Sequence, residues 1–168
     1  TYNHKGVKDS AYLFNGDKSY IKIPNRITDS SFTLVAHTKI EKFIEVNLFP
    51  DTCSGKSGII SNNSENGLYL SWCDKGWEHL DWGKYYQIWY KAGGYTVADQ
   101  EFDQNLRIHL NKYYMFAVTY NKNTKLISLY QDNKLIQRVR RMTNPKGDYF
   151  VGIINPNKTN LNGSLNGV

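Results

Sequence analysis

The sequence lacks several features that would place it in a specific class of protein. None of its apolar runs approaches the ~20 residues of a membrane-spanning helix, so we expect no membrane partner. It has only two cysteines, Cys53 and Cys73, and neither has a second cysteine at metal-ligand spacing, which argues against a structural zinc site. Two interpretations of the pair stay open: one disulfide of an exported protein, or two unpaired thiols.

Other absences narrow the function further. The sequence shows no helical apolar pattern, no internal repeat and no low-complexity linker. No glycine-rich loop precedes a helix, so nothing supports a nucleotide phosphate site. The net charge of +6 is modest and suggests an anionic partner without identifying one. Because no recognised nucleic-acid-binding motif accompanies the basic residues, we expect no nucleic-acid partner.

The clearest positive pattern is a meander of three strands at 111–139. Its side chains alternate with the two-residue period of a strand, and the strands are joined by two short polar turns. The second turn, Asp132-Asn133, is a hairpin signal because Asx residues tolerate left-handed backbone. In the third strand, alternation predicts one face that carries Leu135, Gln137 and Val139, and an opposite face that carries Ile136, Arg138 and Arg140.

The rest of the chain shows further short strands about ten residues apart, separated by Asn, Gly and Lys turns. Hydrophobic residues make up 40% and aromatics 14%, which is enough for a packed core. We therefore predict one all-β domain over residues 1–168, an antiparallel sandwich or barrel. The strands expected outside the meander cover 11–14, 19–23, 32–40, 57–61, 67–72, 84–91, 95–98, 106–110, 149–153 and a start at 161.

Three motifs in order resemble the laminin-G-like, concanavalin A-like lectin-glucanase jelly roll of bacterial and phage surface proteins. They are Phe14-Asn15-Gly16-Asp17 with the strand to Pro24, then Ser31-Phe32-Thr33-Leu34, then residues 114–136. His37 and Asn133 depart from the family pattern, where Trp and Gly are usual. The last strand begins at 162–168 and stops, so we expect it to be truncated or supplied from elsewhere.

The resemblance implies a jelly-roll sandwich and an exported, cell-surface or virion location. Because the chain starts at Thr1 rather than Met, we expect a mature protein or an excised domain. It implies function weakly, because this fold serves lectins, carbohydrate-binding modules, adhesion domains, glycosidases and lyases. The family often holds calcium near the first turn, where Asn15 and Asp17 supply oxygen ligands. A plain turn is the alternative role for Asp17.

The densest group of aromatics lies at 72–90. Trp77 and Trp82 fall in an expected loop there, and sugar rings stack their apolar faces on aromatic planes. Neighbouring polar side chains would contact the sugar hydroxyls; they are Glu78, Asp81 and Lys84. Alternatively, these aromatics hold the loop against the sandwich.

A second candidate is a basic face on the third meander strand. Arg138 and Arg140 share one side of that strand, and arginine matches carboxylate, sulfate or phosphate with two parallel hydrogen bonds. An anionic polymer could bind there, although a solvated outer face is an equally good interpretation.

The enzyme signals are weaker. The Glu-x-Asp-x-x-Glu strand of glycosidases on this fold is absent. Residues 90–95 and Arg107-Ile108-His109 resemble segments of alginate-lyase-type jelly rolls, but they occur in reversed order, and the Arg-x-Glu-x-Arg strand is missing. We therefore expect a non-catalytic module that binds a glycan, with a structural or protein-interaction domain and then a polysaccharide lyase as alternatives.

Overall fold

The computed structural model describes residues 5–8, 11–12, 14, 19–24, 31–41, 53–62, 66–73, 85–92, 95–98, 104–143 and 146–152. Of residues 53–57, 71–73, 85–87 and 104 it describes the backbone alone. Within these ranges the regular structure is strand, apart from one short 3-10 helix, η1 (Gln104–Leu106). No helix in this described part of the chain is long and apolar enough to cross a membrane.

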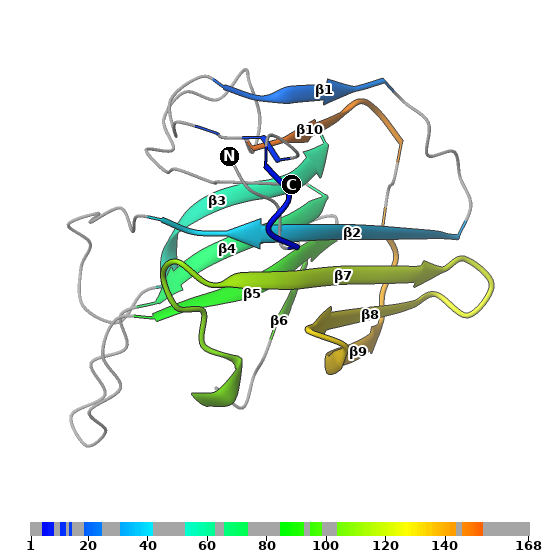
Figure 1. Cartoon of the computed structure of the whole chain (residues 1–168). Coiled ribbons are helices and arrows are strands. Elements are labelled where there is room, and N and C mark those ends of the chain that lie inside the picture. The colour runs from blue at the N-terminus through cyan, green and yellow to red at the C-terminus, as the bar shows by residue number, and fades with distance from the viewer. Residues whose placement is uncertain are drawn as a thin grey trace.

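The ten strands of the described residues form two antiparallel sheets packed face to face, as the sequence predicts (Figure 1). The six-stranded sheet has the order β1 (Ile21–Ile23), β10 (Tyr149–Val151), β3 (Cys53–Asn62), β4 (Gly67–Cys73), β5 (Tyr85–Ala92) and β6 (Tyr95–Ala98). The four-stranded sheet has the order β2 (Phe32–Lys39), β7 (Tyr113–Asn121), β8 (Leu126–Gln131) and β9 (Lys134–Arg140). The fold is thus an all-β sandwich of the jelly-roll type.

The core lies between the inner faces of the two sheets. Phe116, Val118 and Leu129 of the four-stranded sheet are fully buried, as are Leu68 and Tyr90 of the six-stranded sheet. In β2 and β7 the inward positions follow the two-residue period, so these strands direct every second side chain to the core. The opposite positions of β2, β7, β8 and β9 are left to form an outward face.

The two-residue hairpin between β8 and β9 is confirmed. Asp132 and Asn133 both have positive φ, 47° and 66°, the conformation that the tight turn requires. Oδ1 of Asp132 also accepts a hydrogen bond from the Met115 N–H at 2.8 Å, which ties the turn to β7.

Two predicted strands are wrong. Residues 106–110 do not form a strand, because Leu106 ends η1 and Asn111 has a positive φ of 61°. An isolated bridge at Ile108 is the only pairing in that stretch. Ala11, Tyr12 and Phe14 are likewise not in a strand, although the Phe14 side chain is buried in the core.

Candidate functional site: the outer face of the four-stranded sheet

A β-bulge decides which side chains of β9 face outward. Tyr130 pairs with Leu135 while Leu129 pairs with Gln137, so Ile136 is an extra residue on β9. The predicted faces are therefore wrong for Leu135 and Ile136. Leu135 is 42% exposed and lies on the outward face with Arg138, whereas Ile136 packs against the core. Beyond the bulge the alternation is reset, and Arg138 points outward.

The bulge brings Arg138 level with two hydroxyl side chains. Thr119 of β7 pairs with Ser128 of β8, and Ser128 pairs with Arg138 of β9. The Arg138 Nε–H donates a hydrogen bond to Ser128 Oγ at 3.0 Å. This bond fixes the guanidinium plane relative to the sheet, because Nε is rigidly part of it.

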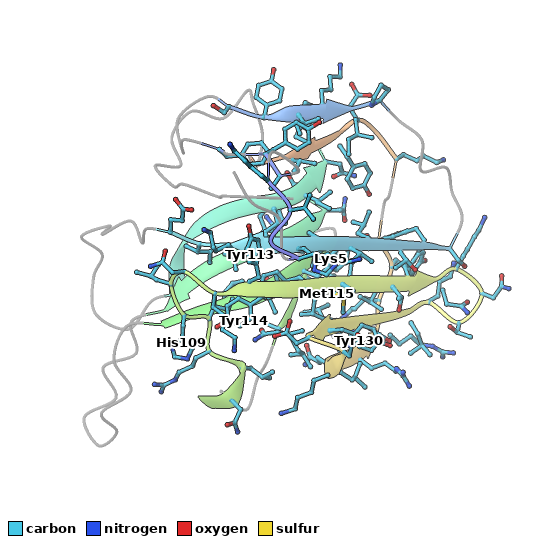
Figure 2. The ribbon with its side chains drawn as sticks, in the orientation of Figure 1. Lys5, His109, Tyr113, Tyr114, Met115 and Tyr130 are labelled. Carbon is cyan, nitrogen blue, oxygen red and sulfur yellow. The ribbon has the colours of Figure 1, made fainter. Side chains whose placement is uncertain are left out.

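Tyr130 is an aromatic side chain of this face, and Figure 2 labels it on β8 with Met115 on the neighbouring strand. A hydrogen bond with Arg138, and as a second cause one with Ser128, holds the pKa of Tyr130 below its ordinary value. Since both partners lie one outward position further along the sheet, the ring leans along the strand. Its cross-strand partner Ala117 is small and only 8% exposed. The Tyr130 ring is therefore partly exposed, and its hydrogen bonds to Arg138 and Ser128 hold it in place.

Arg140 extends the same face toward the β7–β8 turn. Its Nε–H donates to the Thr124 carbonyl oxygen at 3.0 Å, so this guanidinium is also held through Nε. The expected placement of Arg138 and Arg140 on one side of β9 agrees with the observed pairing. We call the outward side chains Thr119, Ser128, Tyr130, Arg138 and Arg140 the Arg138 face.

The positive charge of the chain is concentrated in the segment that carries β7, β8 and β9. Residues 105–143 contain eight Lys and Arg but a single acidic residue, Asp132, a net charge of +7. The other 129 residues contain 13 Lys and Arg and 14 Asp and Glu, a net charge of −1. The overall charge of +6 thus comes entirely from the segment that carries β7, β8 and β9.

The other predicted site residues lie outside the described residues. These are Trp77, Glu78, Asp81, Trp82 and Lys84 of the aromatic segment, and Asn15 and Asp17 of the expected calcium turn. Within the described ranges, no group of three or more His, Cys, Asp and Glu side chains could hold a metal ion.

The two lyase-like segments are described in part. Tyr90 is fully buried, and its hydroxyl shares a hydrogen bond of 2.8 Å with Thr143 Oγ1. Burial raises the pKa of Tyr90 well above its ordinary value, so this phenol is poorly suited to proton transfer with a substrate. His109 is exposed, and its backbone N–H donates to the Tyr114 hydroxyl at 2.8 Å.

Sequence reasoning missed Tyr130, Ser128 and Thr119 as members of a site. The available signal was cross-strand position: the short turns on either side of β8 place outward residues of three consecutive strands side by side. That signal was incomplete because the bulge at Ile136 shifts the register by one residue.

No protein-family profile matches the sequence. No curated protein sequence matches it significantly either. Structural similarity is clear, however, at low sequence identity. The fold is similar to the carbohydrate recognition domain of Emp47p, with a TM-score of 0.50 and 15% identity over 96% of this chain and 81% of that one.

Two bacterial structures share the fold. A protein from Bacteroides ovatus that is classed as carbohydrate-binding gives a TM-score of 0.55 at 15% identity over 94% of this chain, but only 42% of that chain is covered. Domain 4 of the extracellular arabinanase AbnA from Geobacillus stearothermophilus, in complex with arabinotriose, gives 0.53 at 12% identity over 94% of this chain and 68% of that one. These likenesses establish the jelly-roll sandwich.

Proposed function

We propose that the chain is a non-catalytic carbohydrate-binding module of a larger exported or virion protein. The observation that carries the proposal is the partly exposed Tyr130 ring, held beside Arg138 and Ser128 on the outer face of the four-stranded sheet. The similarity of the fold to carbohydrate recognition and carbohydrate-binding domains supports it.

The chemistry of the Arg138 face suits a saccharide. The partly exposed Tyr130 ring offers an apolar plane for the C–H face of a sugar. Thr119 and Arg138 lie on the same face, with Arg138 held by the buried Ser128 hydroxyl, and both can form hydrogen bonds with sugar hydroxyls. An apolar surface with a few oriented polar groups is the usual composition of a small-ligand site.

Two further elements belong to the proposal. Trp77 and Trp82, with Glu78, Asp81 and Lys84, would form a second contact surface. Calcium at Asn15 and Asp17 would stabilise the first turn. Replacing both tryptophans by alanine should abolish binding at that surface and leave the fold intact; unaltered affinity would exclude it.

The test is a glycan array with and without calcium, followed by affinity measurement on any hit with a Tyr130→Ala variant. Loss of the stacking plane should weaken binding by about tenfold. Tyr12→Ala removes a tyrosine that is 62% exposed in the N-terminal segment and is the matched control. Unchanged affinity in Tyr130→Ala would remove this face from the site.

If a folded sample binds no glycan on the array, the alternative of a structural or protein-interaction domain is favoured. The polysaccharide lyase is tested separately. If the protein were a lyase, a uronate polymer incubated with it would gain ultraviolet absorbance as unsaturated ends form. We expect no such gain.

A further inference from the structure

The positive charge of the Arg138 face indicates which class of saccharide binds there. We infer that this face binds a saccharide that carries carboxylate or sulfate groups, with Arg138 and Arg140 contacting the anionic groups and Tyr130 the sugar ring. The inference rests on the proposed carbohydrate-binding function and narrows it to acidic ligands.

The two arginines are spaced and oriented for this task. They lie two residues apart on one side of β9, about 7 Å along the strand. Each guanidinium is held through its Nε–H, by Ser128 Oγ and by the Thr124 carbonyl oxygen. Holding Nε leaves Nη groups in a fixed orientation, and arginine's planar fork then matches a carboxylate or sulfate without much further ordering.

Among the residues that the structure describes, Arg138 and Arg140 have no acidic partner. Elsewhere, Lys22 pairs with Asp148 at 2.6 Å and Lys39 with Glu41 at 2.8 Å. Within the described part of the chain, no carboxylate forms an ion pair with Arg138 or Arg140. The positive potential of this face is therefore available to an anion from outside.

Arg141 shows that the arrangement is specific to one side of β9. It follows Arg140 directly, yet its guanidinium lies over the Tyr95 ring of β6, 5.1 Å from the ring centroid. Arg141 thus carries the same charge a short distance away, without facing the Tyr130 ring. This makes it a matched control for general electrostatic attraction.

The experiment measures affinity of the full chain for polygalacturonate, which carries carboxylates, for dextran sulfate, and for neutral dextran. We expect binding of one or both acidic polymers and much weaker binding of dextran. Arg138→Gln and Arg140→Gln should each weaken acidic-polymer binding about tenfold or more, because each removes charge-assisted hydrogen bonds. Arg141→Gln should change it less than about twofold, as expected of an exposed charge outside the site.

The outcomes separate this inference from the proposed function. Comparable binding of dextran and the acidic polymers, with no effect of Arg138→Gln, would overturn the acidic-ligand inference and leave carbohydrate binding standing. No binding of these polymers and no hit on the glycan array would overturn both. Equal losses of acidic-polymer affinity in Arg138→Gln and Arg141→Gln would show general attraction of polyanions and would also overturn the inference. So would an equal affinity for polyuridylate, a polyanion without carboxylate or sulfate groups. Unchanged melting temperatures of the variants establish that they are folded.

Discussion

Gln137 and Ala98 join the two sheets at one edge of the sandwich. The Ala98 N–H of β6 donates a hydrogen bond to Oε1 of Gln137 on β9, at 2.9 Å. Gln137 occupies an inward position of β9, and Ala98 lies on the edge strand of the other sheet. A side chain thus satisfies a backbone donor that has no strand neighbour on that side.

We expect Gln137→Leu to lower the free energy of unfolding by about 1–3 kcal/mol, because the Ala98 N–H, on a residue only 9% exposed, loses its acceptor. Urea unfolding measures the change. Gln137→Glu keeps an acceptor of the same length and serves as the control. Equal stability of Gln137→Leu and the natural protein would contradict the role given to this bond.

A partly buried chain of hydrogen bonds ties the segment after β9 to the six-stranded sheet. Thr143 Oγ1 donates to Asn66 Oδ1 at 3.0 Å and shares a hydrogen bond with the Tyr90 hydroxyl at 2.8 Å. The Asn66 N–H in turn donates to Asn62 Oδ1 at 2.9 Å, and the Asn62 amide donates to the Lys146 carbonyl oxygen at 3.1 Å. One hydroxyl therefore links β5, the β3–β4 turn and the β9–β10 connection.

Replacing Thr143 by valine keeps the shape and removes this hydroxyl. We expect a loss of about 1–3 kcal/mol, since Asn66 and Tyr90 are fully buried and cannot turn to water. Thr143→Ser retains the hydroxyl and should lose much less. Guanidinium unfolding of the two variants makes the comparison, and a valine variant as stable as the serine variant would disprove the contribution of the network.

The buried tyrosines predict loss of stability in alkali. Burial raises the pKa of Tyr149 from 10.0 to about 12, and it raises that of Tyr90 further. Both groups favour their neutral form in the folded state, so their contribution is complete below pH 10. As the pH rises from 10 toward 12, the unfolded chain ionises first and the free energy of unfolding falls.

Unfolding measured at a series of pH values should show this fall, and Tyr149→Phe should reduce its slope. Tyr12→Phe changes an exposed tyrosine and should leave the slope as it is. If the slope is the same in Tyr149→Phe as in the natural protein, Tyr149 does not titrate as its burial requires.

Local sequence patterns made the sandwich and its meander predictable. The order of strands that pair over long sequence distances was not predictable. The alternation in β7 and β8 and the Asp132-Asn133 turn are determined by neighbouring residues. The position of β10 between β1 and β3 depends on contacts between segments far apart in sequence. No local rule gives that order.

The candidate site was predictable only in part for a similar reason. Arg138 and Arg140 were identified from their residue type and shared strand face. The bulge at Ile136 was missed, because alternation along β9 alone assumes a regular two-residue hairpin. Such a hairpin would have paired Arg138 with Ile127, which is fully buried. Packing of Ile136 against the core favours the extra residue, and the extra residue places Arg138 beside Ser128.

Cys53 and Cys73 are direct partners across the β3–β4 ladder. Directly opposed residues of antiparallel strands have Cα atoms about 4.5–5.5 Å apart, within the range a disulfide spans. We therefore expect one disulfide to form under oxidising conditions, when a disulfide oxidant takes two electrons and two protons from the thiols. It would sit directly before residues 74–84, the segment that contains Trp77 and Trp82.

Such a bond closes a loop of about 20 residues and should stabilise the fold by ~3 kcal/mol. Peptide mapping with and without reductant detects it, and reductant should lower the melting temperature. The double variant Cys53→Ser, Cys73→Ser is the control, because its melting temperature should not respond to reductant. Free alkylation of both cysteines in oxidised, folded protein would show that the strand pairing does not bring the two thiols together.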